Sequence, residues 1–197
     1  MAIISSRLHI PVSETDLLTY LFDSPLQNDP PIVPNEPLVL STEEGDPPGY
    51  SIEQLKYLVK CFASGLTKRG CEGKTVLIYG NWTINFVVSL LGAIGAGAVC
   101  CVCPSNPPRE TEICLGPLRP DFVLCAPEDI QKLHAVADKL EIPLKNVYSL
   151  DSSLEHHGCA DHWASLLDTE DGPAFEWPRL SSEEAKTKTA MLIYTSG

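Results

Sequence analysis

The sequence predicts an α/β protein, a partial doubly wound parallel sheet with flanking helices, preceded by a proline-rich lead-in with a hairpin. Short apolar segments alternate with helical patterns of about 10–15 residues through residues 51–150. These segments are continuously apolar rather than alternating, which is typical of parallel strands covered on both faces. Prolines recur from Pro25 to Pro48 and exclude long helices there.

The composition is that of a folded, acidic globular protein. The 197 residues are 44% apolar, and 14 basic against 26 acidic side chains give a net charge of −12. A nucleic-acid surface needs clustered Lys and Arg, so this charge argues against nucleic acid as a partner. No segment reaches the roughly 18 apolar residues of a membrane span, and the N-terminus lacks a secretory signal pattern. We therefore expect a cytoplasmic protein with no membrane span.

The first elements are a hairpin and a capped helix. Residues 37–40 can pair with the residues around Tyr50, which predicts the hairpin. The segment Ser51-Ile52-Glu53-Gln54 is a capping box, and it predicts the start of a helix. Apolar residues then recur on one helical stripe until Gly70, which predicts the end of that helix.

Strands and helices alternate from there to residue 150. Strands are expected at residues 75–79, 98–103, 121–125 and 146–150. Helices are expected at residues 83–95, near 108–116, and from Pro127 to Leu140. The helix at 83–95 is apolar on nearly every side, which predicts a buried helix.

The last part of the chain changes character twice. Residues 151–188 are acidic and polar, and they predict a surface excursion with a short helical piece about 163–167. Order returns in residues 189–194, which predict a strongly apolar, buried strand.

The residues that could bind a metal or act as nucleophiles are better explained by roles in the structure. The cysteines concentrate in apolar segments, so we expect free, buried thiols and a reducing compartment. Five potential ligands lie between His156 and His162, but their spacing matches no standard zinc module, and a polar surface loop is favoured. No Gly-x-Ser-x-Gly nucleophile turn is present. We assign no metal site and no catalytic residue.

The turn after the last strand is the most informative feature. Thr195, Ser196 and Gly197 follow the apolar strand directly. After a parallel strand, a loop of this kind can turn its hydroxyls and backbone N–H groups toward a phosphate. Taken alone, the three residues also fit a simple turn.

Seven segments of the chain, the last of which contains this turn, follow one another in a recognisable order. They are Tyr50–Leu55, Phe62–Leu66, Gly73–Val76, Asn81–Phe86, Leu91–Val99, Asn106–Pro107 and Thr189–Gly197. In this order they resemble the N-terminal part of adenylate-forming (AMP-binding) acyl-CoA synthetases similar to 4-coumarate–CoA ligase. The last segment matches the opening of the family motif Tyr-(Thr/Ser)-Ser-Gly-(Thr/Ser)-Thr-Gly-x-Pro-Lys-Gly. Lys74 departs from the family pattern, in which an acidic residue is usual.

The resemblance implies a two-step reaction on a small-molecule carboxylic acid. The acid attacks the α-phosphorus of ATP with the help of Mg²⁺, and coenzyme A then displaces AMP to form a thioester. Thr195, Ser196 and Gly197 would open the loop that binds the β- and γ-phosphates. In this family many relatives carry a peroxisomal address, so a peroxisomal location is an alternative for a full-length relative.

The resemblance also implies that most of the catalytic residues lie beyond Gly197. We therefore expect residues 1–50 to form a lead-in and residues 51–197 to form an incomplete N-terminal α/β domain. Such a truncated chain would be inactive alone and would bind none of ATP, Mg²⁺ and coenzyme A tightly. One alternative is a fragment of an amino-acid adenylation domain of a peptide synthetase. Another is a non-catalytic interaction module, which could self-associate through an exposed sheet edge.

Overall fold

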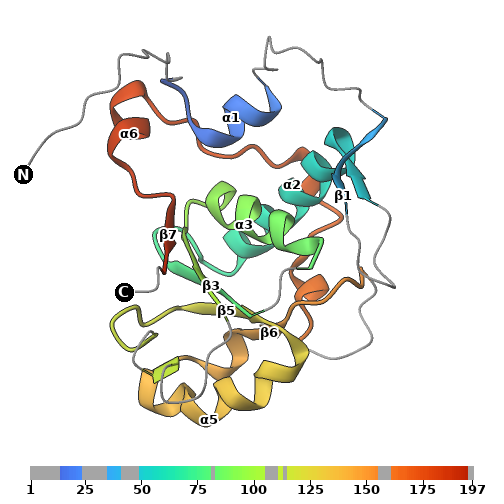
Figure 1. The fold of residues 1–197 in the computed structure, drawn as a ribbon. Coiled ribbons are helices and arrows are strands. Elements are labelled where there is room, and N and C mark those ends of the chain that lie inside the picture. The colour runs from blue at the N-terminus through green and yellow to red at the C-terminus, as the bar shows by residue number, and fades with distance from the viewer. Residues whose placement is uncertain are drawn as a thin grey trace, which may run out of the picture.

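The structure is a computed structural model, and it describes residues 14–23, 35–40, 49–80, 83–104, 111–112, 115–154 and 161–194. Five parallel strands form one sheet in the order β6-β5-β3-β4-β7, and β1 and β2 form a separate antiparallel pair (Figure 1). The strands are β1 (Pro37–Leu40), β2 (Gly49–Ser51), β3 (Thr75–Tyr79), β4 (Val99–Cys103), β5 (Phe122–Cys125), β6 (Val147–Ser149) and β7 (Met191–Ile193). The predicted α/β class with a parallel sheet is confirmed.

Helices connect these strands. The α-helices are α1 (Leu17–Phe22), α2 (Ile52–Lys68), α3 (Asn85–Gly95), α5 (Ile130–Leu140) and α6 (Ser182–Thr187). Short 3₁₀ turns are η1 (Pro127–Asp129), η2 (Leu144–Asn146), η3 (Trp163–Leu166) and η4 (Gly172–Ala174). Of the short helix predicted near 108–116, residues 111, 112 and 115 are helical and residue 116 is in a turn. Residues 108–110, 113 and 114 lie outside the described residues. No helix in the described part of the chain is long and apolar enough to cross a membrane.

The predicted hairpin and capping box are both confirmed. β1 pairs antiparallel with β2, and Val39 lies opposite Tyr50. The Ser51 hydroxyl accepts a hydrogen bond from the Gln54 N–H at 3.3 Å, and the Gln54 side chain accepts one from the Ser51 N–H at 2.9 Å. These reciprocal bonds satisfy two backbone donors that the first turn of α2 leaves without intrahelical partners. Because β2 runs directly into this cap, the hairpin fixes where α2 begins.

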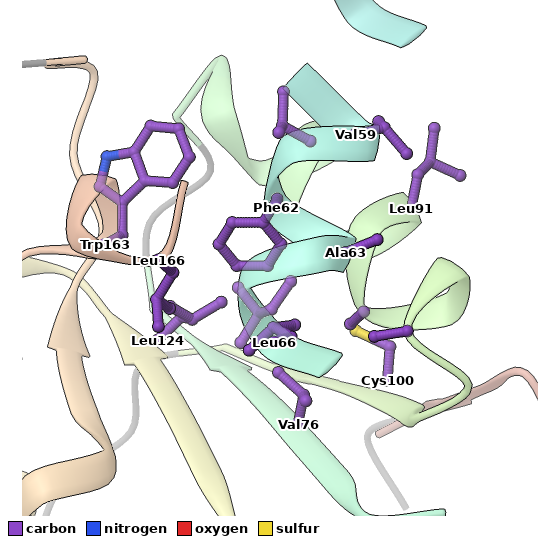
Figure 2. Close-up of a cluster of buried hydrophobic side chains, with 14 of the residues drawn as sticks. Val59, Phe62, Ala63, Leu66, Val76, Leu91, Cys100, Leu124, Trp163 and Leu166 are labelled. Carbon is purple, nitrogen blue, oxygen red and sulfur yellow. The ribbon is translucent and has the colours of Figure 1, made fainter. Parts of the chain in front are cut away.

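The sheet is covered by α2 and α3 on one face and by α5 on the other. Successive side chains of a strand point to opposite faces. In β4, Cys100 and Val102 therefore join the core beside α2 and α3, whereas Cys101 and Cys103 join the core beside α5. Figure 2 shows part of the first core, where Phe62 and Leu66 of α2 lie over the sheet. The absence of polar alternation in these strands reflects this burial on both faces.

Helix α3 is less enclosed than its sequence predicts. Its buried positions include Val88, Leu91 and Ala93, which face α2 and the sheet. A second stripe is only partly buried, and it consists of Phe86, Val87, Leu90 and Ile94. The prediction that this helix is buried on every side is therefore wrong for the second stripe, which the described residues cover only in part.

Residues 161–180, here called the strap, run along α2 and correct another prediction. Trp163, Leu166 and Trp177 are all buried, and they pack into the same core as Phe62 of α2. The backbone N–H of Asp168 donates to the carbonyl of Cys61 at 3.0 Å, so the strap also bonds to the helix backbone. The polar surface excursion predicted for residues 151–188 is wrong for these buried positions, whereas most of residues 169–180 are exposed as predicted. The predicted helical piece is present as η3.

Charged side chains fasten the strap to α2. The Lys68 ammonium lies 2.8 Å from Asp168 and 2.6 Å from Asp171, and the Ser64 hydroxyl donates to Asp168 at 2.5 Å. The hydrogen bonds from Lys68 and Ser64 lower the pKa of Asp168 to about 2. The hydrogen bonds from Lys68 to Asp168 and Asp171 raise the pKa of Lys68 above its usual value. Both groups are therefore ionised at neutral pH and attract each other.

This pairing predicts a pH-dependent contribution to stability. A carboxylate with a lowered pKa stabilises the fold fully above its unfolded pKa of about 3.8, and the contribution is lost as pH falls through about 2. We expect Asp168→Asn to lower the urea midpoint at pH 6 and to have a much smaller effect near pH 2. Urea unfolding of both proteins across this range measures the difference. Equal differences at both ends of the range would contradict the assignment.

Candidate functional site

The carboxyl ends of all five parallel strands meet at one edge of the sheet. The strands reach that edge at Tyr79, Cys103, Cys125, Ser149 and Ile193. In open parallel sheets, ligands bind outside the carboxyl ends of the strands, where helix N-termini and connecting loops converge. This edge is therefore where ligand-binding groups are expected.

The turn predicted to bind phosphate begins at this edge. The Tyr194 N–H points to the Val102 carbonyl at 3.4 Å, so the chain stays beside β4 up to that residue. The Tyr194 side chain packs against the core on the α5 side. Thr195, Ser196 and Gly197 follow at once but lie outside the described residues. The structure therefore shows where the turn starts, at the carboxyl end of a parallel strand.

Strand β7 itself differs from its prediction. Met191, Leu192 and Ile193 are 39%, 44% and 63% exposed, although a buried strand was expected. In the part of the chain that the structure describes, β7 is the last strand of the sheet and pairs with β4 only, so it has a neighbouring strand on one side.

The usual ligand crevice of a doubly wound sheet is filled by an ion pair. The direction of winding reverses between β3 and β5, which is where such a crevice opens. Gly80 follows β3 with φ of +100°, and a Cβ there would lie only 2.7 Å from the Asp129 carboxylate. Asp129 is buried and pairs with Lys132 at 2.5 Å. A carboxylate at this point repels phosphate, so the reversal point does not suit a nucleotide phosphate.

Neighbouring groups hold this ion pair in place. The Lys132 ammonium lies 5.7 Å from the centre of the Tyr79 ring, and the Tyr79 hydroxyl lies 2.7 Å from the hydroxyl of Thr111. Tyr79 is fully buried at the end of β3. These contacts link β3, residue 111 and α5, and they favour a structural role for the group.

A second polar network lies at the same edge, and the sequence did not reveal it. The Tyr50 hydroxyl donates to the Asn85 side chain at 2.6 Å, and the Asn85 amide donates to the Asp151 carbonyl at 2.9 Å. Asn85 is fully buried at the start of α3. The network therefore joins β2, α3 and the segment after β6, three parts that are distant in the chain.

His162 extends this network and corrects a prediction. The residue is only 5% exposed, whereas the stretch from His156 to His162 was expected to be a polar surface loop. Its Nδ1 accepts from the Ala164 N–H at 3.2 Å, so the neutral ring carries its proton on Nε2. Nε2 lies 3.1 Å from both carboxylate oxygens of Asp151. Both ring nitrogens thus have partners, and His162 fixes the strap to the end of β6.

The remaining candidate ligands are thiols, which stay protonated. Burial raises the pKa of Cys71 and of Cys125 to about 12 and that of Cys101 to about 11. Cys100 and Cys103 have chelating spacing in sequence but point to opposite faces of β4. In the described ranges, no three His, Cys, Asp or Glu side chains form a group that could hold a metal ion. Residues 156–160 lie outside those ranges.

Two cavities open among the described residues. One of about 390 Å³ opens beside Tyr50, Tyr57 and Leu154, and its charged lining group is Glu53. The other, of about 130 Å³, lies near Ala98 and Ala190, toward the amino ends of β4 and β7. The carboxylate of Glu53 in the larger cavity would repel phosphate, and the smaller cavity is too small for a nucleoside triphosphate. Neither cavity therefore suits this ligand. The phosphate-binding turn predicted at residues 195–197 therefore stays a prediction.

Comparison with known proteins gives the same picture of the fold. The family model described as "AMP-binding enzyme" matches residues 34–197. A nicotinic acid-CoA ligase of Aspergillus fumigatus is 25% identical over 212 residues, which cover 95% of this chain and 36% of that protein.

Solved structures agree in fold at lower identity. MatB from Rhodopseudomonas palustris matches with a TM-score of 0.62 and 21% identity over 92% of this chain and 32% of its own. The long-chain-fatty-acid-CoA ligase FadD1 from Archaeoglobus fulgidus matches with a TM-score of 0.63 and 17% identity, over 80% of this chain and 30% of its own. The chain thus spans about a third of the length of these relatives. Since the family model matches most of its residues, the chain belongs to the AMP-binding enzyme family.

Proposed function

We propose that the chain forms the N-terminal α/β part of an ATP-dependent acid–CoA ligase. Such an enzyme joins a small carboxylic acid to AMP and then transfers the acyl group to coenzyme A. The observation that carries the proposal is the parallel strand β7, whose carboxyl end leads directly into Thr195, Ser196 and Gly197. The relation to a nicotinic acid-CoA ligase favours this function over an amino-acid adenylation domain.

In this proposal, the residues after β7 bind the phosphates of ATP. Adenylation displaces pyrophosphate from the α-phosphorus, so catalysis depends on positioning and neutralising the β- and γ-phosphates. The hydroxyls of Thr195 and Ser196 donate to phosphate oxygens, and Gly197 lets the backbone approach them closely. Mg²⁺, which binds phosphate oxygens and retains several waters, supplies further charge neutralisation when bound.

We also propose that the 197-residue chain does not catalyse adenylation by itself. It spans about a third of the related enzymes, and an active site assembled from two domains needs residues from both. We place it in the cytoplasm, because the described cysteines are free thiols, as expected in a reducing compartment. Pyrophosphate exchange with a panel of carboxylic acids tests the inactivity, and turnover would contradict it.

The phosphate site itself is testable by ATP binding. We expect the chain to bind ATP weakly and the double variant Thr195→Ala, Ser196→Ala to bind at least about tenfold more weakly, because each charge-assisted hydrogen bond contributes about 1.5–3 kcal/mol. Equilibrium dialysis with ATP measures both affinities. Ser182→Ala is the matched control, since the Ser182 hydroxyl lies exposed on α6 and donates to Glu14. Equal ATP affinity in the double variant and the parent would contradict the site.

A further inference from the structure

The smaller cavity lies at the amino ends of β4 and β7, at the opposite end of the sheet from the point where the 195–197 turn begins. Its volume is about 130 Å³, and its walls come from the start of α1, the end of α3, the end of the strap, α6 and the residues just before β7. Figure 1 shows α1 and α6 on the same side of the sheet as α3. All of the walls are formed by residues that the structure describes.

The size and lining of this cavity suit one six-membered ring. Most of the lining residues are apolar, and Leu18, Ala98 and Trp177 are only 3%, 4% and 3% exposed. An engineered apolar cavity of about 150 Å³ binds benzene. The cavity therefore has room for a single aromatic or alicyclic ring.

Polar contacts hold the walls of the cavity in place. The Asp16 carboxylate accepts hydrogen bonds from the N–H and the hydroxyl of Thr19, at 2.8 and 2.6 Å. Arg179, at the end of the strap, pairs with Asp23, at the end of α1, at 2.5 Å. Because these contacts fix α1 against the strap, the cavity is formed before a ligand binds, which lowers the entropic cost of binding.

Two lining residues offer hydrogen-bond donors that the described residues do not use. Lys188, at the end of α6, is exposed and forms no ion pair with the described part of the chain. The indole N–H of Trp177 is buried and also lacks a hydrogen-bond partner there. The carboxylate of Asp16, by contrast, already accepts a hydrogen bond on each of its oxygens. A ligand that brings a negatively charged acceptor therefore matches this lining.

We propose that this cavity binds a small carboxylate that carries one ring, with the ring among the apolar walls and the carboxylate directed to Lys188. On the proposed function, this site is separate from the one where the acid reacts with ATP. Four residue steps of about 3.3 Å, about 13 Å in all, separate Ala190 in the cavity wall from Tyr194, where the phosphate-binding turn begins. The bound carboxylate stabilises the folded protein and takes no part in adenylation.

Ligand-observed nuclear magnetic resonance titrations without ATP test the proposal. Benzoate is the probe, and benzyl alcohol, which has the same ring and no charge, is the neutral comparison. We expect both to bind and benzoate to bind more tightly, at physiological ionic strength, where the net charge of −12 is largely screened.

Filling the cavity tests its location. Ala98→Leu places a larger side chain in the cavity, and we expect it to weaken both ligands at least about tenfold, because the ring no longer fits. Ala190→Leu fills the cavity from another wall and serves as a second variant. Circular dichroism verifies that each variant is folded.

Lys188→Gln tests the charge. We expect it to weaken benzoate about threefold, the scale of an exposed ion pair, and to leave benzyl alcohol unchanged. Lys186→Gln is the matched control, since Lys186 is on the same helix but pairs with Glu14 and Glu183 and does not line the cavity.

The double variant Thr195→Ala, Ser196→Ala separates this site from the phosphate turn. We expect it to bind benzoate as the parent does, whatever its affinity for ATP. Loss of benzoate binding in this variant would overturn the proposal, because it would place the acid at the turn. No binding of either ligand to the parent, full benzoate affinity in both cavity-filling variants, or equal losses in Lys186→Gln and Lys188→Gln would also overturn it.

Discussion

Replacement of Gly65 by alanine is expected to destabilise the protein by about 3 kcal/mol or more, since core overpacking typically costs 1–3 kcal/mol and backbone contacts relax least. Gly65 lies inside α2, where the strap crosses it. A Cβ at this position would lie 1.7 Å from the Leu166 carbonyl oxygen and 2.8 Å from its carbon. No side-chain rotation relieves a contact with backbone atoms, so the strap must move away from the helix.

The sign of this effect is diagnostic. Alanine is more favourable than glycine in a helix interior by about 1 kcal/mol, so propensity alone predicts stabilisation. A loss of stability therefore measures the close approach of the strap. Gly172→Ala is expected to act in the same direction, because its Cβ would lie 2.6 Å from the Cα of Cys61 on the same side of α2.

Urea unfolding followed by far-ultraviolet circular dichroism measures these losses. Gly73→Ala is the matched control: it has φ of +71° but nothing within 4 Å of its Cβ, so its cost is backbone strain without a clash. We expect Gly65→Ala to exceed the control clearly. A stability of Gly65→Ala equal to or above that of the parent would show that the strap does not contact α2 as described.

The sequence was sufficient for the elements that depend on local signals. The capping box at Ser51, the proline at the start of η1 and the continuously apolar strands each have a local physical cause, and each appears in the structure. Their signal lies within a few neighbouring residues, because hydrogen bonds of caps and the pattern of strands are short-range properties.

The strap could not be predicted in the same way. Its buried residues, among them Trp163, Leu166 and Trp177, are separated by polar residues with neither a helical nor a strand period. Their burial depends on Gly65 and Gly172, which let the chain approach α2. This close fit between the strap and α2 depends on two segments that are distant in the sequence. The hydrophobic periodicity of either segment alone does not reveal it.

Part of the candidate site could likewise be predicted from local sequence signals, and part could not. The position of the turn after β7 followed from an apolar strand and three residue types, which are local. The network of Tyr50, Asn85, Asp151 and His162 did not, because its members come from four different segments. One signal was present: a polar residue at an otherwise apolar helix start, Asn85, implies a buried partner. The exposure of β7 was also missed, since a strand's place in the sheet order is a tertiary property.

Replacement of Trp163 by alanine is the second substitution expected to cause a large loss of stability. The side chain is fully buried, packs 6.0 Å from the Phe62 ring between centroids, and donates its indole N–H to the Ser153 carbonyl at 2.9 Å. Figure 2 shows it facing α2 from the strap. Removing such a side chain leaves a cavity and removes the hydrogen bond to Ser153, so we expect Trp163→Ala to lower the free energy of unfolding by about 3–5 kcal/mol.

Trp163→Phe separates the two contributions. It keeps an aromatic ring against Phe62 and removes the hydrogen bond to Ser153, so we expect a smaller loss of about 1–3 kcal/mol. Tyr57→Ala is the control for loss of an exposed aromatic ring, since Tyr57 is 45% exposed on α2. Thermal and urea unfolding measure all three variants. If the strap were a solvated loop, Trp163→Ala would cost no more than Tyr57→Ala; a large excess follows only when the indole is part of the core that holds α2 against the sheet.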